Sequence, residues 1–150
     1  MIEKYYLFAE LSEEESEEIE KRLFLKHYDK DTIIFEEDDV VDSIYFIEEG
    51  EVEIYKYVDG KKQQHIIDLS DGEFFGEIGA LNSSKRFANA KAKTDVQALV
   101  LLKSDFERIL KKDEELKHKI YKNFLDEMIK RLRLSDNKFK KFFRTVLRGN

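Results

Sequence analysis

Between Leu25 and Leu102 the chain consists of short runs of β-branched and aromatic residues, with turn residues between one run and the next. The runs lie at residues 32–35, 43–47, 51–55, 65–67 and 96–102. Runs of this length and composition are typical of β-strands. Asp59-Gly60 follows one of them and is a hairpin signal, because Asp and Gly accept left-handed backbone angles. Many short strands at this spacing predict a sandwich, barrel or jelly roll.

Helical signals flank the β-rich region on both sides. Residues 12–15 (Ser-Glu-Glu-Glu) fit a capping box, and we expect a short helix from there to about Leu23. After the last β-rich run the apolar spacing becomes helical, and residues 104–107 fit a second capping box. Asp113 begins a further helix, with acidic residues in the first turn where the helix dipole favours them.

That last helix carries a long apolar seam with one polar member. Its members recur at alternating steps of four and three residues: Tyr121, Leu125, Met128, Leu132, Ser135, Phe139, Phe142 and Val146. Such a heptad pattern is typical of paired parallel helices. Packing of the helix on its own β-rich body is the alternative, and part of the seam is expected to do this. The seam is longer than a small body covers, which favours a homodimer through this helix.

Charge and composition limit the classes of function that the chain can have. The chain has 150 residues and is 41% apolar, as expected for one globular domain. Its net charge is −6, yet residues 111–150 hold about 13 Lys and Arg against about 6 acidic residues. The acidic body disfavours nucleic acid, and a solvated helix face explains the basic tail. No cysteine, no signal-peptide pattern and no apolar run near the ~20 residues of a membrane span are present, so the cytoplasm is expected.

The segment from Gly72 to Ala92 carries the chemistry. It contains glycines that allow close backbone approach, a short helix opening near Glu77, and Arg86 nine residues later. A helix N-terminus offers free N–H groups to an anion, and an arginine can bind the oxygens of a phosphate in a fork. A carboxylate repels phosphate, so its natural partner is a sugar hydroxyl on the same ligand. A nucleotide carries both groups, a phosphate for the arginine and a sugar hydroxyl for the carboxylate. The alternative is a surface ion pair between Glu77 and Arg86, which contributes under ~1 kcal/mol.

Residues 75–81 (Phe-Gly-Glu-Ile-Gly-Ala-Leu), followed by residues 86–88 (Arg-Phe-Ala), resemble the phosphate-binding cassette of cyclic-nucleotide-binding domains. This family includes protein kinase regulatory subunits, cyclic-nucleotide-gated channels and the catabolite activator proteins. The resemblance spans nearly the whole chain. Residues 7–12 are similar to the opening of the family, residues 42–52 to its central hairpin, and residues 130–135 to the dimer helix of the activators.

The resemblance implies a fold and a domain organisation. The expected fold is mainly β with flanking α: an antiparallel β-roll of the jelly-roll or double-stranded β-helix type, with an N-terminal helix and a long C-terminal helix. Residues 1–112 then form the cyclic-nucleotide-binding β-roll. Residues 113–150 form the long C-terminal dimerisation helix of the same domain.

The resemblance also implies roles for the residues of the cassette. Glu77 corresponds to the carboxylate that holds the ribose 2′-hydroxyl, and Arg86 to the arginine that holds the cyclic phosphate. The cassette positions expected to complete the phosphate site with backbone groups are Gly76, Ile78, Gly79, Phe87 and Ala88.

Residues outside the cassette are expected to contact the base. Ile54 and Ile66 fall where the family places apolar side chains against it, although a plain core role explains them equally well. Ser135 and Asp136 match the pair through which the activators' dimer helix reaches adenine. A hydroxyl can donate to or accept from a base edge, and a carboxylate can accept from the amine of adenine. A polar break that sets helix register is the alternative for this pair.

Several positions depart from the family pattern. Lys85, Ser83 and Asn89 stand where the family usually has Pro, Gly, and Thr or Ser, respectively. The turn glycines expected near Asp31 and within residues 37–39 are also missing. These departures concern the geometry of loops, and the predicted fold does not depend on them.

The resemblance implies a non-catalytic regulatory domain that binds cyclic AMP and signals through its C-terminal helix to an unidentified downstream protein. Cyclic GMP is the second candidate ligand. Phe87 disfavours guanine, because a Ser or Thr after the arginine is associated with guanine contacts in the family. A bulky Phe beside the phosphate also keeps an alternative open: a degenerate fold that serves as a dimerisation or scaffold module, with no ligand or a different one.

Two other classes of function are disfavoured. A jelly-roll metalloenzyme needs clustered ligands, whereas His27, His65 and His118 are scattered along the sequence, so we expect no metal. The related activators carry a helix-turn-helix after the long helix, and this chain ends at Asn150, where that module would begin. We therefore expect no sequence-specific DNA binding.

Overall fold

The structure is a computed structural model that describes residues 1–82 and 85–148, with side chains described for residues 1–81 and 85–134. Its helical elements are η1 (Tyr6–Phe8), α1 (Glu13–Glu20), α2 (Glu77–Asn82), α3 (Lys103–Lys112) and α4 (Glu114–Arg148). Its strands are β1 (Phe24–Tyr28), β2 (Ile33–Phe35), β3 (Ser43–Glu49), β4 (Val52–Val58), β5 (Lys62–Leu69), β6 (Phe74–Phe75), β7 (Asn89–Ala92) and β8 (Val96–Leu102). No helix in the described ranges is long and apolar enough to cross a membrane.

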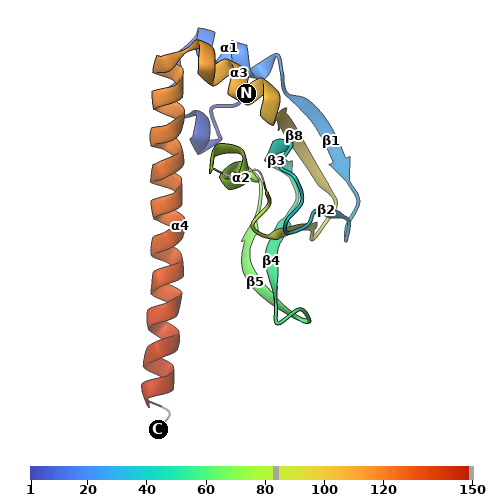
Figure 1. Cartoon of the computed structure of the whole chain (residues 1–150), viewed down its shortest axis with the longest axis vertical. Helices are drawn as coiled ribbons and strands as arrows, with labels where there is room; N and C mark the ends of the chain where they lie inside the picture. The colour runs from blue at the N-terminus through green and yellow to red at the C-terminus, as the bar shows by residue number, and fades with distance from the viewer. Residues whose placement is uncertain (83–84, 149–150) are drawn as a thin grey trace.

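The strands form two four-stranded sheets whose pairings are all antiparallel. One sheet has the order β1-β8-β3-β6 and the other β2-β7-β4-β5. The helices lie at one side and one end, and α4 runs down the length of the molecule beside the roll (Figure 1). This confirms the predicted antiparallel β-roll with an N-terminal helix and a long C-terminal helix.

Alternation along β3 divides the core into two clusters. Tyr45 and Ile47 point between the sheets, where they pack with apolar residues of both sheets. Ile44 and Phe46 point to the opposite face, which the N-terminal segment, α3 and the first turns of α4 cover. Side chains far apart in sequence therefore meet on each face of one strand, and the N-terminal segment and helices belong to the same folded unit as the roll.

The turns explain how the roll tolerates its missing glycines. Asp59 and Gly60 connect β4 and β5 with φ angles of 54° and 73°, which confirms the predicted hairpin. Asp31 and Asp38 both have φ of 71°, at the two places where the sequence lacks the expected turn glycines. Aspartate tolerates the left-handed region better than most residues, so these turns form without glycine.

The N-terminal helix begins as predicted, whereas the start of α3 does not. Ser12 and Glu15 form both bonds of the capping box, although α1 ends at Glu20, three residues before the predicted end. The capping box predicted for residues 104–107 is wrong: α3 begins at Lys103, without a side-chain cap. The pairing of β8 with β3 continues to the residue before Lys103, so strand passes directly into helix and residue 104 lies inside the first turn.

The start of α4 was predicted from Asp113, whose carboxylate caps the helix by accepting from the Leu116 N–H at 3.0 Å. The first half of this helix is fixed to the body. Asn123 is buried and donates to the carbonyl oxygens of Leu7 and Ala9, at 3.0 and 2.9 Å. Because these bonds are made in the interior, they hold α4 against the N-terminal segment.

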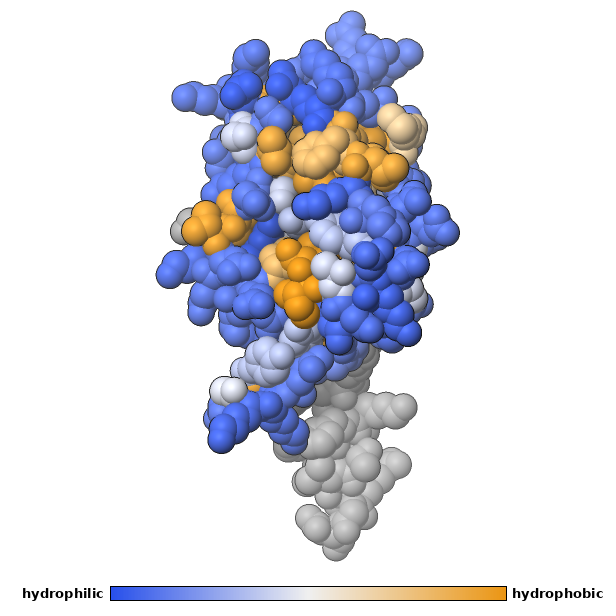
Figure 2. Space-filling model, turned by 90° about the vertical axis from the view of Figure 1, so that its right-hand side faces the viewer, coloured by the Kyte–Doolittle hydropathy of each residue, from blue (hydrophilic) through white to orange (hydrophobic). Residues whose placement is uncertain are grey.

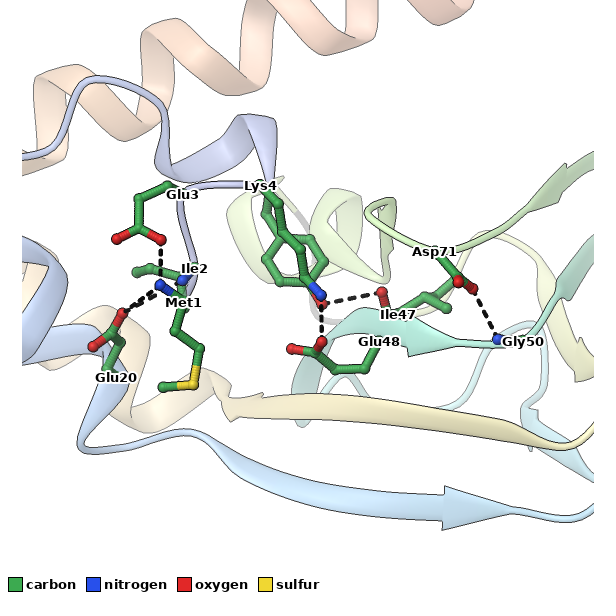
Figure 3. A network of polar contacts seen from close by, with 10 residues as sticks. Met1, Ile2, Glu3, Lys4, Glu20, Ile47, Glu48, Gly50 and Asp71 are labelled. Atoms are coloured by element: carbon green, nitrogen blue, oxygen red, sulfur yellow. Dashed lines mark hydrogen bonds and ion pairs between the residues drawn. The ribbon is translucent and has the colours of Figure 1, made fainter.

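The N-terminal segment is in turn fixed to β3 by the polar network of Figure 3. Tyr5 is fully buried and its hydroxyl donates to the Ile47 carbonyl at 3.0 Å, while the neighbouring Lys4 pairs with Glu48. Burial raises the pKa of the Tyr5 hydroxyl well above its ordinary value, which keeps it a donor. The roll, the N-terminal segment and α4 are thus linked in series.

The outer surface on the β1 side is mostly hydrophilic, with separate apolar patches (Figure 2). β1 is an edge strand, and its Phe24 and Leu25 are exposed. Lys26 and His27 follow them on the same edge, and charged edge residues oppose pairing with another strand.

Candidate functional site

A cavity of about 540 Å³ opens between the β4–β5 hairpin, the β6–α2 turn and the middle of α4. Nine of the predicted site residues line it: Ile54, Ile66, Gly76, Glu77, Ile78, Gly79, Arg86, Phe87 and Ala88. The other two, Ser135 and Asp136, lie outside the residues whose side chains the structure describes. The fold therefore gathers residues separated by more than thirty positions into one pocket.

Gly76 joins β6 to α2 in a conformation that requires glycine. Its φ is +84°, and a Cβ built there would lie 2.8 Å from Nη1 of Arg86 and 3.3 Å from the Ser43 carbonyl oxygen. Gly79, in the first turn of α2, has no space either, because a Cβ would lie 2.3 Å from a methyl of Val41. The glycines that the motif identified thus let the cassette backbone approach both the roll and Arg86 closely.

Arg86 is a buried cation, with 3% of its surface exposed. It donates to the carbonyl oxygens of Gly76 and Ser43 at 2.9 and 2.8 Å, and its Nε–H has no hydrogen-bond partner. The carboxylate of Asp42 lies 3.5 Å away, on a largely exposed side chain. Burial lowers the pKa of Arg86, which still remains charged at neutral pH because an arginine cannot be deprotonated there. A buried cation with a free donor is what an anion site requires.

Glu77 is buried as well, and it is paired with a residue that the sequence analysis did not identify. Only 1% of Glu77 is exposed, and its Oε1 accepts from Nη1 of Arg131 on α4 at 2.7 Å. Burial raises the pKa of Glu77, and the charge of Arg131 opposes that rise. The alternative of a surface ion pair between Glu77 and Arg86 is therefore wrong: both are buried, and Glu77 is bonded to Arg131.

Arg131 binds the cassette at two points. Besides Glu77, it donates to the Phe74 carbonyl oxygen at 2.7 Å and lies over the Phe74 ring. Within α4 it also pairs with Glu127 at 3.3 Å. The bonds to Phe74 and Glu77 flank Gly76, so α4 holds the cassette on both sides of its glycine. The one sequence signal for Arg131 was its place in the segment similar to the activators' dimer helix.

A β-bulge shapes the apolar wall. Ile54 pairs with Ile67 and Tyr55 pairs with His65, which leaves Ile66 as an extra residue on β5. Ile66 and Ile67 both line the cavity as a result. Ile54 is also part of the buried cluster between the sheets, whereas Ile66 is 37% exposed. The core interpretation therefore holds for Ile54 and not for Ile66.

Phe87, which replaces the Ser or Thr of the family pattern, is half exposed at the cavity. Its ring lies 6.0 Å from the Lys56 ammonium, and Lys56 pairs with Glu37 at 3.1 Å. Phe87 therefore sits among solvated charges at the edge of the cavity, and its ring is not packed into the core.

Among the described residues, one group of potential metal ligands lies at the outer side of β4 and β5, and of its members only Asp68 also lines the cavity. His65 is beside Glu53 and Asp68, with the three ligand atoms within 4.8 Å of one another, although sequence spacing made the histidines look scattered. His65 Nδ1 is 2.7 Å from Glu53, and Lys93 is 2.9 Å from Asp68. Hydrogen bonding and an ion pair thus account for the proximity of these side chains.

Residues 25–113 match the family described as the cyclic nucleotide-binding domain. A cAMP-dependent protein kinase regulatory subunit of Candida albicans is 33% identical over 132 residues, which are 88% of this chain. The chain spans only 28% of the length of that relative.

Solved structures show the same fold. A cyclic nucleotide-binding domain from Methylobacillus flagellatus KT superposes with a TM-score of 0.80 at 24% identity, covering 91% of this chain and 77% of that one. The cAMP-bound PfPKA-R (141–441) is 35% identical with a TM-score of 0.68, covering 72% of this chain and 38% of that one.

Proposed function

Because the chain belongs to the cyclic nucleotide-binding domain family, we propose that it is a regulatory domain and that it binds cyclic AMP in the cavity beside Arg86. One observation carries the proposal. Arg86 is a buried cation with an unpartnered Nε–H, and it lies in the same cavity as the buried carboxylate of Glu77. An anion bonded to Arg86 supplies the missing acceptor, and the apolar wall of the cavity suits a base.

Each part of the ligand has a partner in this arrangement. The cyclic phosphate bonds to Arg86 and to backbone N–H groups of the cassette, which Gly76 allows to approach closely. The ribose 2′-hydroxyl donates to Glu77, and the base lies against Ile54 and Ile66. Cyclic AMP is favoured over cyclic GMP because Phe87 replaces the Ser or Thr associated with guanine contacts, and because the Candida relative is named as cAMP-dependent and the PfPKA-R structure is cAMP-bound.

The output runs through α4. Arg131 already holds Glu77, so a ribose hydroxyl that binds Glu77 changes the hydrogen bonding of a residue on that helix. A ligand that interacts differently with two positions of α4 shifts the balance between them. The proposed role is therefore non-catalytic: the domain senses the nucleotide and passes the signal to an unidentified downstream protein, with the cytoplasm as the expected location.

Calorimetry with cyclic AMP, cyclic GMP and a cyclic dinucleotide tests the ligand. We expect cyclic AMP to bind most tightly and Arg86→Ala to lose about 1.5 to 3 kcal/mol, the contribution of a charge-assisted hydrogen bond. Arg108→Ala is the matched control, because Arg108 is an exposed arginine of α3 outside the cavity. Absence of binding to all three nucleotides would instead favour a scaffold module that has lost its ligand.

The second part of the proposal is a homodimer through α4. Of the described part of the predicted seam, Leu125 and Leu132 are 58% and 69% exposed, and Ile129 beside them is also exposed. Met128 is partly buried, and both Met128 and Leu132 also line the cavity. A row of exposed Leu and Ile side chains at heptad spacing is an association hazard on a lone helix. A second copy of α4 offers the same row and covers it.

Sedimentation at micromolar concentration tests the dimer. We expect a dimer for the wild type and a monomer for Leu125→Glu, whereas Leu25→Glu, at an equally exposed leucine on β1, remains a dimer. A monomeric wild type, with and without cyclic AMP, would exclude the dimer. Ser135→Ala weakens cyclic AMP binding without dissociating the dimer if this residue contacts adenine, and unchanged affinity would leave it only the register role.

A further inference from the structure

The guanidinium of Arg86 lies over an aromatic ring to which the sequence motif gives no role. The guanidinium carbon of Arg86 lies 4.0 Å from the ring centroid of Phe35, on strand β2. That ring is supported in turn by Tyr45 and Phe75, each with its centroid 5.9 Å away, and these two rings stack on each other at 4.9 Å. Three aromatic side chains, those of Phe35, Tyr45 and Phe75, thus pack together behind the guanidinium of Arg86.

The stack meets a physical need of the buried guanidinium. Removing a cation from water is unfavourable unless neighbouring groups replace its hydration. Two carbonyl oxygens satisfy two sides of the Arg86 group, and Asp42 contributes a carboxylate on an exposed side chain at 3.5 Å. The face of an aromatic ring attracts a cation, most strongly where both are desolvated. Because guanidinium is planar, stacking also fixes the orientation of its plane.

We propose that Phe35 is a positioning residue for Arg86, holding the guanidinium plane in place before any ligand arrives. The two carbonyl bonds set its position within that plane, and the ring prevents it from tilting. The Nε–H is then left in a constant place as the unpartnered donor. Such preorganisation strengthens anion binding because the ligand does not have to order the side chain. In this respect the inference rests on the proposed function.

Two substitutions at Phe35 distinguish the effect of the aromatic face from the effect of side-chain volume. Phe35→Leu keeps an apolar side chain but removes the aromatic face, and Phe35→Tyr restores that face. Tyr57→Leu is the control, because it removes an exposed aromatic ring of β4 that lies outside the cavity. With cyclic AMP as the probe, we expect Phe35→Leu to bind about tenfold more weakly, and Phe35→Tyr and Tyr57→Leu to bind like the wild type.

A second measurement needs no ligand. The Nε–H resonance of Arg86, assigned by its loss in Arg86→Lys, is expected to be shifted upfield by the ring current of Phe35. The shift is expected to persist in Phe35→Tyr and to vanish in Phe35→Leu, and the Nε–H of Phe35→Leu is expected to exchange faster with water because its orientation is no longer fixed. If Phe35→Leu does not fold, the chemical shift of the Arg86 Nε–H in the wild type tests the positioning role alone: an upfield shift supports it, and an ordinary shift overturns it.

The two measurements distinguish the two ways of failing. If the wild type binds cyclic AMP and Phe35→Leu binds it equally well, the positioning role is overturned while the proposed function stands. If the wild type binds no cyclic AMP, the proposed function fails, and the resonance then decides: an upfield shift that depends on the ring supports the positioning role, and an ordinary position overturns it.

Discussion

The two faces of the β4–β5 ladder carry charges in opposite surroundings. On the cavity side, Glu77 and Arg86 are almost completely buried. On the outer side, His65 is about half exposed and pairs with Glu53, and Asp68 beside them is about two-fifths exposed and also reaches the cavity lining. Water and salt weaken the interactions of the outer group, whereas the inner charges interact in a medium of low dielectric. The difference teaches where substitution has consequences: charges inside the cavity are expected to govern stability and binding.

The largest expected effect comes from removing the partner of a cavity charge. Arg131→Met leaves Glu77 buried without its cation, and breaking a buried pair in this way costs about 3 kcal/mol of unfolding free energy at pH 7. Urea unfolding measures the loss. Arg108→Met, which removes an exposed arginine 3.7 Å from Asp105, is the control and is expected to change stability by under ~1 kcal/mol.

For the same variant we predict that the loss of stability depends on pH, with a sign that follows from the raised pKa of Glu77. A carboxyl group whose pKa is higher in the folded than in the unfolded state destabilises the fold above that pKa. The penalty is relieved as the pH falls through the folded pKa toward the ordinary value of 4.5. Without Arg131 the pKa rises further, so the loss in Arg131→Met should be smaller at pH 5 than at pH 7. An equal loss at both would contradict the assignment to Glu77.

The second largest effect compares a cavity glycine with a surface glycine of the same backbone conformation. Gly72 and Gly76 both have φ of +84°, but a Cβ at Gly72 would meet nothing within 4 Å. Gly72→Ala is therefore expected to cost only the left-handed strain, about 1 kcal/mol. Gly76→Ala adds steric overlap with Arg86 and Ser43, so the total loss of unfolding free energy is expected to be about 2 kcal/mol. The substitution is also expected to weaken cyclic AMP binding. Thermal unfolding with calorimetry tests both, and equal losses would remove the special role of the cavity turn.

Local patterns predicted those parts of the molecule that depend on local physics. The β-rich runs became strands, Asp59-Gly60 became the hairpin, and Ser12 capped its helix. The cassette motif identified Glu77 and Arg86, and both of them line one cavity. In these cases the strand period, the turn conformation or the spacing of a motif is visible within a few residues.

What the sequence could not predict depends on contacts between distant elements. Arg131 meets Glu77 across 54 positions, and its part in the pair follows from how α4 lies against the cassette. The bulge at Ile66 has no glycine to mark it. The stacking of Phe35 under Arg86 arises only when β2 packs beside the cassette. The capping box at residue 104 was wrong because strand pairing, a tertiary effect, decided where α3 begins.

A third, smaller effect separates the two isoleucines of the cavity wall. Ile54 is 6% exposed and packs in the core, so Ile54→Val should cost about 1 kcal/mol of stability. Ile66 is 37% exposed on the bulge, so Ile66→Val should leave unfolding unchanged within about 0.3 kcal/mol and act on ligand affinity alone. Chemical unfolding and calorimetry of the pair test this assignment, and a large stability loss in Ile66→Val would make Ile66 a core residue.

The smallest effect is expected on the outer face. His65→Ala should change the unfolding free energy by no more than about 0.5 kcal/mol, because the side chain is about half exposed and Lys93 still compensates Asp68. Thermal unfolding with and without zinc ions makes the test sharper. The ligand atoms of Glu53, His65 and Asp68 lie within 4.8 Å of one another, which is close enough to share such an ion. A ligand that binds only the folded state raises its stability. If zinc stabilised the wild type but not His65→Ala, the outer face would be a binding site in its own right, and the contrast between the two faces of this ladder would no longer hold.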